Sequence, residues 1–197
     1  MSTTEAARSR RQRVPAAERR DALIEAAIVE FAHGGLHGTP VDRIARRVGV
    51  AQPYVFSLFP SKRELFIAAV ERGFERVGEV FTRAAAEFDP VTAEPEMDVL
   101  KAMGRGYVEL VASDRSLLML QHQGYAACDD EQIRARVRGA YARLIVQIEE
   151  LTGAEPERID EFIRYGMWLN VAAAMGVEDL SAGCEWVRDQ AAQPRGD

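Results

Sequence analysis

Histidine and cysteine, two residue types that carry out much of catalysis and metal binding, are few and widely spaced in this chain of 197 residues. Glu30 and His33 have the Glu-x-x-His spacing of di-iron helical bundles, but that chemistry requires a second such motif and two further glutamates facing one core. The sequence has three histidines in all, and its two cysteines, Cys128 and Cys184, lie far apart with no Cys-x-x-Cys spacing. We therefore expect no metal site, no cofactor and no enzymatic activity.

Three polar side chains have instead the chemistry to recognise nucleic acid. Gln52, Tyr54 and Ser57 carry hydrogen-bonding groups that can reach base edges or phosphates. The apolar Val55 and Phe59 stand among them at i and i+4 spacing. A helix over this segment would therefore bury the apolar pair and expose the polar side chains.

The segment that precedes these residues would hold them in place. A helix predicted at 40–48 has one apolar stripe, and a tight turn at Gly49 separates it from the helix at 52–59, where Pro53 fits the first turn. Two short helices joined in this way form the helix-turn-helix plan, whose second helix enters the major groove of DNA. The apolar stripe consists of Val41, Ile44, Ala45 and Val48, and the outer face carries Arg43, Arg46 and Arg47.

The distribution of charge agrees with a DNA-binding front end. Residues 1–63 carry 11 lysines and arginines against six acidic residues, a formal charge of +5. The rest of the chain carries 14 basic against 25 acidic residues, a formal charge of −11. Such a protein would attract a polyanion at one end and repel it at the other, although two solvated helix faces would produce the same asymmetry.

Proline spacing and apolar periodicity predict an all-α fold. No segment shows sustained apolar and polar alternation, and no Asn-Gly or Asp-Gly hairpin signal is present. Residues 1–16 are predicted to form a disordered basic arm that either contacts DNA or is a plain tail. The predicted helices span residues 17–33, 40–48, 52–59, 62–88, 97–112, 114–124, 129–152, 156–175 and 178–192.

Capping signals mark several of the helix ends. Thr39 to Asp42 and Ser61 to Glu64 both have the capping-box pattern, with Pro40 at the first helical position of the first box. Gly153 fits a left-handed helix end, and Pro156 begins the next helix.

Residues Arg19 to Phe81 resemble the N-terminal domain of the TetR family of bacterial transcriptional regulators. The resemblance implies a helix-turn-helix DNA-binding domain over residues 17–77, with its motif at about 40–59. It further implies a ligand-binding and dimerisation domain over residues 78–197. The matching positions are Gly35, Gly38, Thr39, Ile44, Ala45, Gly49, Val50, Phe56 to Phe59, Lys62, Leu65 and Phe66.

The resemblance also implies which residues contact DNA. Lys62 begins a long helix, whose N-terminal N–H groups favour a phosphate. The chain departs from the family at Ala51, where a capping residue is usual, and at Phe56, Ser57 and Leu58, where polar side chains are common. The residues expected at the DNA surface are Thr39, Arg43, Gln52, Pro53, Tyr54, Ser57 and Lys62.

For the second domain, the resemblance implies an effector cavity and a dimer interface formed by the last two long helices. We expect a mostly apolar small molecule, held by one or two hydrogen bonds, although the same residues would also make an ordinary core. The residues assigned to the cavity are Phe74, Met103, Tyr107, Gln121, His122, Tyr125, Tyr141 and Trp168. Those assigned to the dimer interface are Phe162, Gly166, Leu169, Asn170, Ala173, Leu180 and Trp186.

The sequence thus predicts a homodimeric regulator that binds a palindromic double-stranded operator with half-sites about 34 Å apart and is released by its effector. Two other classes stay open: a DNA-binding protein of the same type without a ligand switch, and, remotely, a helical-bundle enzyme. A cytoplasmic location without a membrane partner is expected. The longest run free of charged residues, Tyr165 to Val177, is too short to span a bilayer.

Overall fold

The computed structural model describes residues 15–95 and 97–176. Every regular element in these residues is an α-helix, which confirms the predicted all-α class. The predicted helix at 178–192 and the arm up to residue 14 lie outside the described residues. The helices are α1 (Ala16–Gly38), α2 (Val41–Val48), α3 (Gln52–Leu58), α4 (Lys62–Glu87), α5 (Val99–Ser113), α6 (Arg115–Ala126), α7 (Glu131–Thr152) and α8 (Pro156–Met175).

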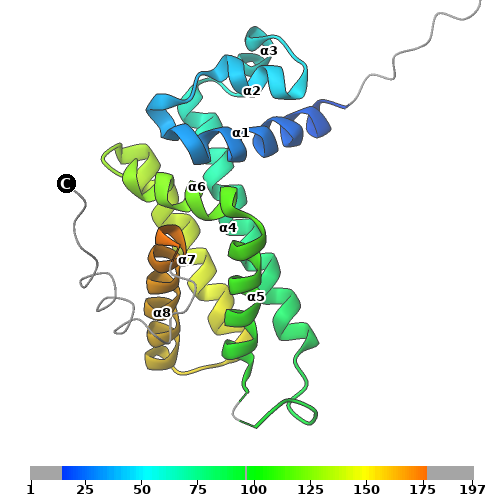
Figure 1. Cartoon of the computed structure of the whole chain (residues 1–197), viewed down its shortest axis with the longest axis vertical. Helices are drawn as coiled ribbons and strands as arrows, with labels where there is room; N and C mark the ends of the chain where they lie inside the picture. Colours follow the sequence, from blue (N-terminus) through cyan, green and yellow to red (C-terminus); the bar gives the residue numbers. More distant parts are fainter. Residues whose placement is uncertain (1–14, 96, 177–197) are drawn as a thin grey trace, which may run out of the picture.

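The helices form a small head on an elongated body (Figure 1). Helices α1, α2 and α3 make up the head, and α4 runs from it into the body beside α5. Helices α6, α7 and α8 complete the body, with α6 lying directly against α1. None of the described helices is both long and apolar enough to cross a membrane.

Most of the predicted helix ends are confirmed, because the capping chemistry acts locally. The Ser61 hydroxyl accepts a hydrogen bond from the Glu64 backbone N–H at 3.1 Å and so begins α4. Gly153 ends α7 in the left-handed conformation, and Pro156 begins α8. The capping box at Thr39 is wrong: Pro40 is the N-cap of α2, and the Thr39 hydroxyl instead donates to the Glu30 carbonyl at 3.1 Å.

A single buried core runs through the head and the body. The ring of Phe31 in α1 meets that of Phe66 in α4 edge-on, with 5.0 Å between their centroids. The buried side chains continue along α4 through Phe74 to Phe81, which packs against the body helices. The predicted boundary between residues 77 and 78 thus falls inside a continuous helix with a continuous core.

Helix α1 continues beyond the predicted end at residue 33 because it passes through a kink. Gly35 has φ 61° and ψ −172°, a conformation that is open almost only to glycine, and the helix resumes as far as Gly38. An added Cβ at Gly35 would lie 2.4 Å from the Gln123 side-chain oxygen of α6. The kink therefore brings the backbone of the head against the body.

Replacing Gly35 with alanine is expected to lower the free energy of unfolding by about 1–3 kcal/mol, because the backbone is strained and the new methyl group meets Gln123. Urea denaturation would measure this loss. Gly38→Ala is the matched control, since a Cβ there meets nothing within 4 Å. Equal stability of the two variants would contradict a structural requirement for glycine at the kink.

Candidate functional site

The outer face of the head carries the residues predicted to read DNA. Gly49, with φ 72° and ψ 33°, ends α2 in the left-handed conformation and leaves only a short turn before α3. Ala51 is the N-cap of α3 and makes no side-chain cap bond, so packing holds this helix. Val55 is buried, as is Phe59 directly after the helix, whereas the predicted contact residues Gln52, Pro53, Tyr54 and Ser57 are exposed.

Two predicted contact residues make hydrogen bonds within the head. The Ser57 hydroxyl donates to the Tyr54 carbonyl at 2.7 Å, which keeps it next to the exposed tyrosine. The Lys62 ammonium donates to the His37 carbonyl at 3.2 Å and so joins the start of α4 to the end of α1. Partial burial lowers the pKa of Lys62.

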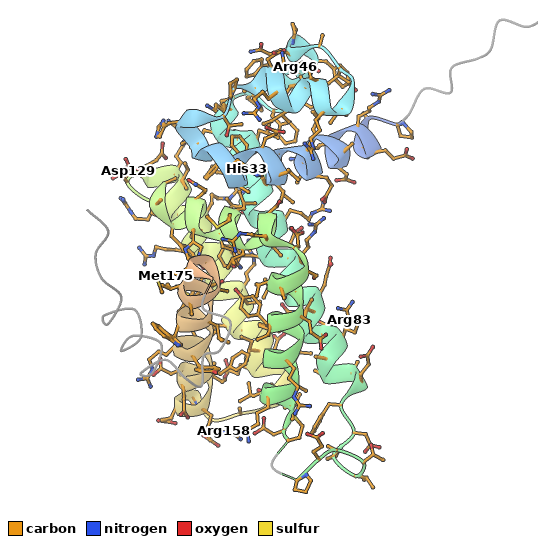
Figure 2. All side chains as sticks on the ribbon, viewed as in Figure 1. His33, Arg46, Arg83, Asp129, Arg158 and Met175 are labelled. Atoms are coloured by element: carbon orange, nitrogen blue, oxygen red, sulfur yellow. The ribbon has the colours of Figure 1, made fainter. Side chains whose placement is uncertain are left out.

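One carboxylate organises the arginines of α2. Glu30 in α1, whose side chain is only 11% exposed, pairs with Arg43 at 3.1 Å and with Arg47 at 3.2 Å. Arg46 pairs with Asp42 one turn away on the same helix. The three guanidinium groups remain at least half exposed, so the pairs hold positive charge at the surface. Arg46 lies at the end of the molecule farthest from the body (Figure 2).

The structure gives the Glu-x-x-His motif and Thr39 a role in packing. Thr39 is 2% exposed, so its side chain braces the backbone of α1 rather than standing at the surface where it was expected. His33 Nδ1 lies 2.8 Å from the Val29 carbonyl. Among the described residues, no group of three or more histidine, cysteine, aspartate or glutamate side chains is placed to hold a metal ion.

A cation–π contact that the sequence did not indicate fixes the end of α3. The Arg20 guanidinium carbon lies 4.7 Å from the centroid of the Phe59 ring. Such contacts contribute about 0.5–1 kcal/mol at an exposed site. No spacing rule connects an arginine in α1 with an aromatic residue after α3, because only the tertiary fold brings them together.

The body encloses a second candidate site, a cavity of about 60 Å³ between α4, α5, α6, α7 and α8. None of the described residues that line it carries a formal charge, and most are aromatic or aliphatic. Five of the eight residues predicted for the effector line this cavity: Phe74, Tyr107, Gln121, Tyr125 and Tyr141.

A buried polar cluster forms one side of the cavity. The Tyr107 hydroxyl lies 3.0 Å from Gln121 Oε1 and donates a hydrogen bond to Asn170 Oδ1. These three side chains come from α5, α6 and α8, so the cluster joins three helices across the cavity. The Tyr125 hydroxyl, by contrast, has only the Met167 sulfur as a partner among the residues that the structure describes, at 4.0 Å, and thioether sulfur is a weak acceptor.

Burial keeps the phenols of the cavity protonated. Burial, followed by the neighbouring Tyr141, raises the pKa of Tyr125 to about 12. Burial also raises the pKa of Tyr107, with a further contribution from Tyr125, and raises that of Tyr141. At neutral pH each hydroxyl is therefore an uncharged group able to donate a hydrogen bond.

The remaining residues predicted for the effector lie outside the cavity lining. Met103 is fully buried in the core, and His122 Nε2 lies 3.2 Å from the Asn170 carbonyl. Trp168 is 47% exposed on the outside of α8. The sequence places Met103, His122 and Trp168 in largely apolar segments. Which residues of such a segment line a cavity depends on how each helix is rotated about its axis, and the sequence does not fix that rotation.

The residues predicted for the dimer interface have a different placement. Phe162, Gly166, Leu169 and Asn170 line the cavity, and Ala173 packs against the core. Leu180 and Trp186 lie outside the described residues. The face of α8 that points away from the core instead exposes Trp168, Val171 and Met175 at i, i+3 and i+7 spacing.

Comparison with known proteins assigns the head to a family. Residues 23–69 match the family described as bacterial regulatory proteins, tetR family. The chain is 41% identical over 63 residues to the HTH-type transcriptional activator FasR of Mycolicibacterium smegmatis, a match that covers 32% of this chain and 29% of that protein. It is 34% identical over 68 residues to the HTH-type transcriptional repressor KstR of the same organism, covering 34% and 33% respectively.

The likeness of the fold extends over most of the chain. A TetR-like transcriptional regulator from Rhodococcus sp. RHA1 superposes with a TM-score of 0.63 at 22% identity, covering 92% of this chain and 100% of that chain. The head and the body thus define an all-helical protein with an N-terminal helix-turn-helix domain. Its residues 23–69 match the tetR family of bacterial regulatory proteins, and the fold of the whole chain is like that of TetR-like regulators.

The family assignment bears on the other predictions in two ways. The matched proteins are transcriptional regulators and not enzymes, which agrees with the prediction from the sequence of a regulator without enzymatic activity. The sequence matches cover only about a third of the length of each curated relative. They therefore concern the DNA-binding head and not the cavity.

The phenol of Tyr125 predicts an alkaline loss of stability. Its folded pKa of about 12 lies above the ordinary value of about 10, so its contribution is complete below pH 10 and is lost as pH rises to about 12. Between pH 10 and pH 12, the wild type is expected to lose about 2 kcal/mol more of its free energy of unfolding than Tyr125→Phe loses, because the variant has no phenol to ionise. Urea denaturation at several pH values measures the difference. Tyr54→Phe, which removes an exposed phenol, is the matched control, and an unchanged slope in Tyr125→Phe would refute the prediction.

Proposed function

We propose that the chain is a ligand-responsive, DNA-binding transcriptional regulator, most simply a repressor, that binds a palindromic operator as a homodimer. A small, mostly apolar effector in the cavity would release it. The observation that carries this proposal is the course of α4, which begins at the DNA-facing head and lines the cavity with Phe74, Val77 and Phe81. FasR is named an activator and KstR a repressor, so the sign of regulation rests on the operator's position.

The exposed face of α3 supports DNA as the partner of the head. Gln52 and Tyr54 project from a short helix that Val55 and Phe59 anchor to the core, as expected for a helix that enters the major groove. Arg43, Arg47 and Lys62 flank this helix with positive charge that can reach phosphates. Phosphate contacts would position the head, and the contacts of α3 with base edges would supply the sequence preference.

The chemistry of the cavity supports an uncharged effector. A charged group placed among these side chains would lose its hydration without gaining a counter-ion, which costs several kcal/mol. Tyr125 is the best-placed polar anchor, because its weak sulfur partner is easily exchanged for a carbonyl, ether or hydroxyl oxygen. The side chains of Tyr107, Gln121 and Asn170 are already engaged with one another and would mainly shape the wall.

An ionic network between head and body supports coupling of the two sites. Arg76 of α4 pairs with Glu25 of α1 and lies 3.4 Å from Asp114, the residue that caps α6. On the other side of this junction, Gln123 of α6 lies against the kink of α1 at Gly35. A ligand that displaces α4 or α6 would therefore move α1, and with it the orientation of α3. Coupling free energies between such sites are typically about 1–3 kcal/mol and are reciprocal.

The exposed stripe of α8 supports dimerisation. Trp168, Val171 and Met175 expose large apolar side chains on one face of the helix. A two-fold axis beside this face would bury the stripe against its own copy, as an isologous interface requires. The interface would thus use α8, as the sequence predicted, but through residues other than those assigned to it.

Arg43→Ala is expected to weaken operator binding and to lower the slope of log K against log salt by about one for each head, because one phosphate contact is lost. The operator would first be selected from random double-stranded DNA by the purified protein, and binding would then be measured by fluorescence anisotropy at several salt concentrations. Arg83→Ala is the control, since Arg83 is an exposed arginine of α4 in the body (Figure 2). If no duplex is retained, or if both variants lose the same slope, the proposed DNA surface is wrong.

Val171→Arg is expected to convert the dimer into monomers, because it places charge at the centre of the apolar stripe. Sedimentation velocity would measure the change. Val91→Arg is the matched control, because Val91 is an exposed valine in the loop between α4 and α5. A Val171→Arg protein that sediments as the wild type does would exclude this face of α8 as the interface.

A further inference from the structure

An open groove lies between α5 and α8 next to the cavity. Its volume is about 790 Å³, more than ten times the 60 Å³ of the cavity itself. The two spaces share four lining residues: Gly104, Phe162, Tyr165 and Leu169. The groove and the cavity therefore lie on two sides of one shared set of residues, which we call the passage and define by these four residues.

The cavity alone is too small for a typical effector. Pockets that bind drug-sized ligands measure roughly 300–1,000 Å³, and an empty cavity of about 150 Å³ holds only a single aromatic ring. A molecule that entered this cavity of about 60 Å³ would have to enlarge it or extend out of it. Extension through the passage would require the Phe162 ring to move aside, but no helix to unfold.

In the passage, the backbone of Gly104 lies close to the ring of Phe162, and Gly104 adds no side chain of its own. A Cβ added to this residue of α5 would lie 3.5 Å from Cε2 of Phe162 in α8, so a larger side chain there would project against that ring. The Phe162 ring packs against Phe81 of α4, with 5.7 Å between their centroids. Phe162 thus stands between the groove and the part of α4 that lines the cavity.

The groove has an apolar wall and a charged rim. Leu100 and Val108 of α5 face Phe162 and Leu169 of α8 across it. Two ion pairs lie at its rim, Arg158 with Asp98 at 2.6 Å and Arg105 with Glu94 at 3.0 Å. The other charged residues that line the groove are Lys101, Glu109 and Glu161, so its three basic and three acidic residues balance. The wall therefore favours an aliphatic or aromatic chain, and the rim selects neither sign of charge.

The groove is separate from the other two proposed surfaces. The apolar groove residues of α8, Phe162 and Leu169, lie about 140° around the helix axis from the mean direction of the exposed stripe of Trp168, Val171 and Met175. A dimer formed through that stripe would approach the edge of the groove at Glu161 but leave its apolar wall open. Arg158, at the rim, lies at the end of the body opposite the head (Figure 2). A molecule in the groove would therefore not touch DNA.

We propose that the effector is an elongated, uncharged, largely apolar molecule that occupies both spaces, with one end in the cavity and its body running through the passage into the α5–α8 groove. This inference rests on the proposed function, since it names the class of ligand for that site. Gly104 and Phe162 then set the length of ligand that is accepted. Neither residue is needed for the DNA surface.

A series of straight-chain 1-alkanols from butanol to decanol tests the proposal, because each member adds one CH₂ to the same head group. In the full-length protein, affinity is expected to rise about fourfold per CH₂, the equivalent of about 0.8 kcal/mol, up to the longest chains. Isothermal titration calorimetry would measure the affinities. In Gly104→Leu the rise is expected to stop at the short alkanols, because the leucine side chain fills the passage.

Gly104→Ala is the matched control and should follow the wild type, because its Cβ makes only an ordinary contact with Phe162. Phe162→Trp fills the passage from the other side and decides the question if Gly104→Leu does not fold. If the wild type stops gaining affinity at short chains, or if Gly104→Leu and Phe162→Trp follow the wild type, the groove is not part of the site, although the cavity remains one. If no alkanol binds the wild type, the effector cavity of the proposed function falls with it.

Discussion

The contact between Phe31 and Phe66 fixes α4 in the head, and the same helix then has to pack inside the body. Over the 15 residues from Phe66 to Phe81, α4 rises about 22 Å while its buried side chains pass from one group of helices to the other. An α-helix is stiff over this length, so α4 cannot tilt in the body without moving the head. The separation of DNA surface and cavity, and the means of connecting them, both follow from this one buried helix.

Charged side chains are arranged around α1 in a way that complements the buried core. On its outer side, Glu30 holds Arg43 and Arg47 with their guanidinium groups still exposed. On its inner side, Glu25 pairs with Arg76, which also reaches the α6 cap Asp114. Exposed ion pairs add little stability, so their importance lies in orientation. They place positive charge beside α3 and bind the head to the body through groups that a small rotation can separate.

The body combines rigid and adaptable parts around its cavity. The cluster of Tyr107, Gln121 and Asn170 joins three helices through the Tyr107 hydroxyl, so it resists rearrangement. Tyr125 has only a weak sulfur partner among the described residues. The ring of Phe162 makes no hydrogen bond and lies where the cavity adjoins the groove. A wall that is firm on one side and open on the other suits a site that accepts a ligand from outside without losing its fold.

Local interactions within a few residues determined the helices and the helix-turn-helix of the head. The Ser61 box, the left-handed Gly49 and Gly153, and the apolar spacing of α1 and α2 act within a few residues, so the sequence alone predicted nearly every helix and the exposed face of α3. Other features depend on how the helices rotate and pack against one another. These are the contact of Arg20 with Phe59, the burial of Asn170 and exposure of Trp168, and the passage at Gly104. A stripe of apolar residues in a helix indicates that one face of the helix is buried. Only the tertiary structure decides whether that face packs against a core, a cavity or a second subunit.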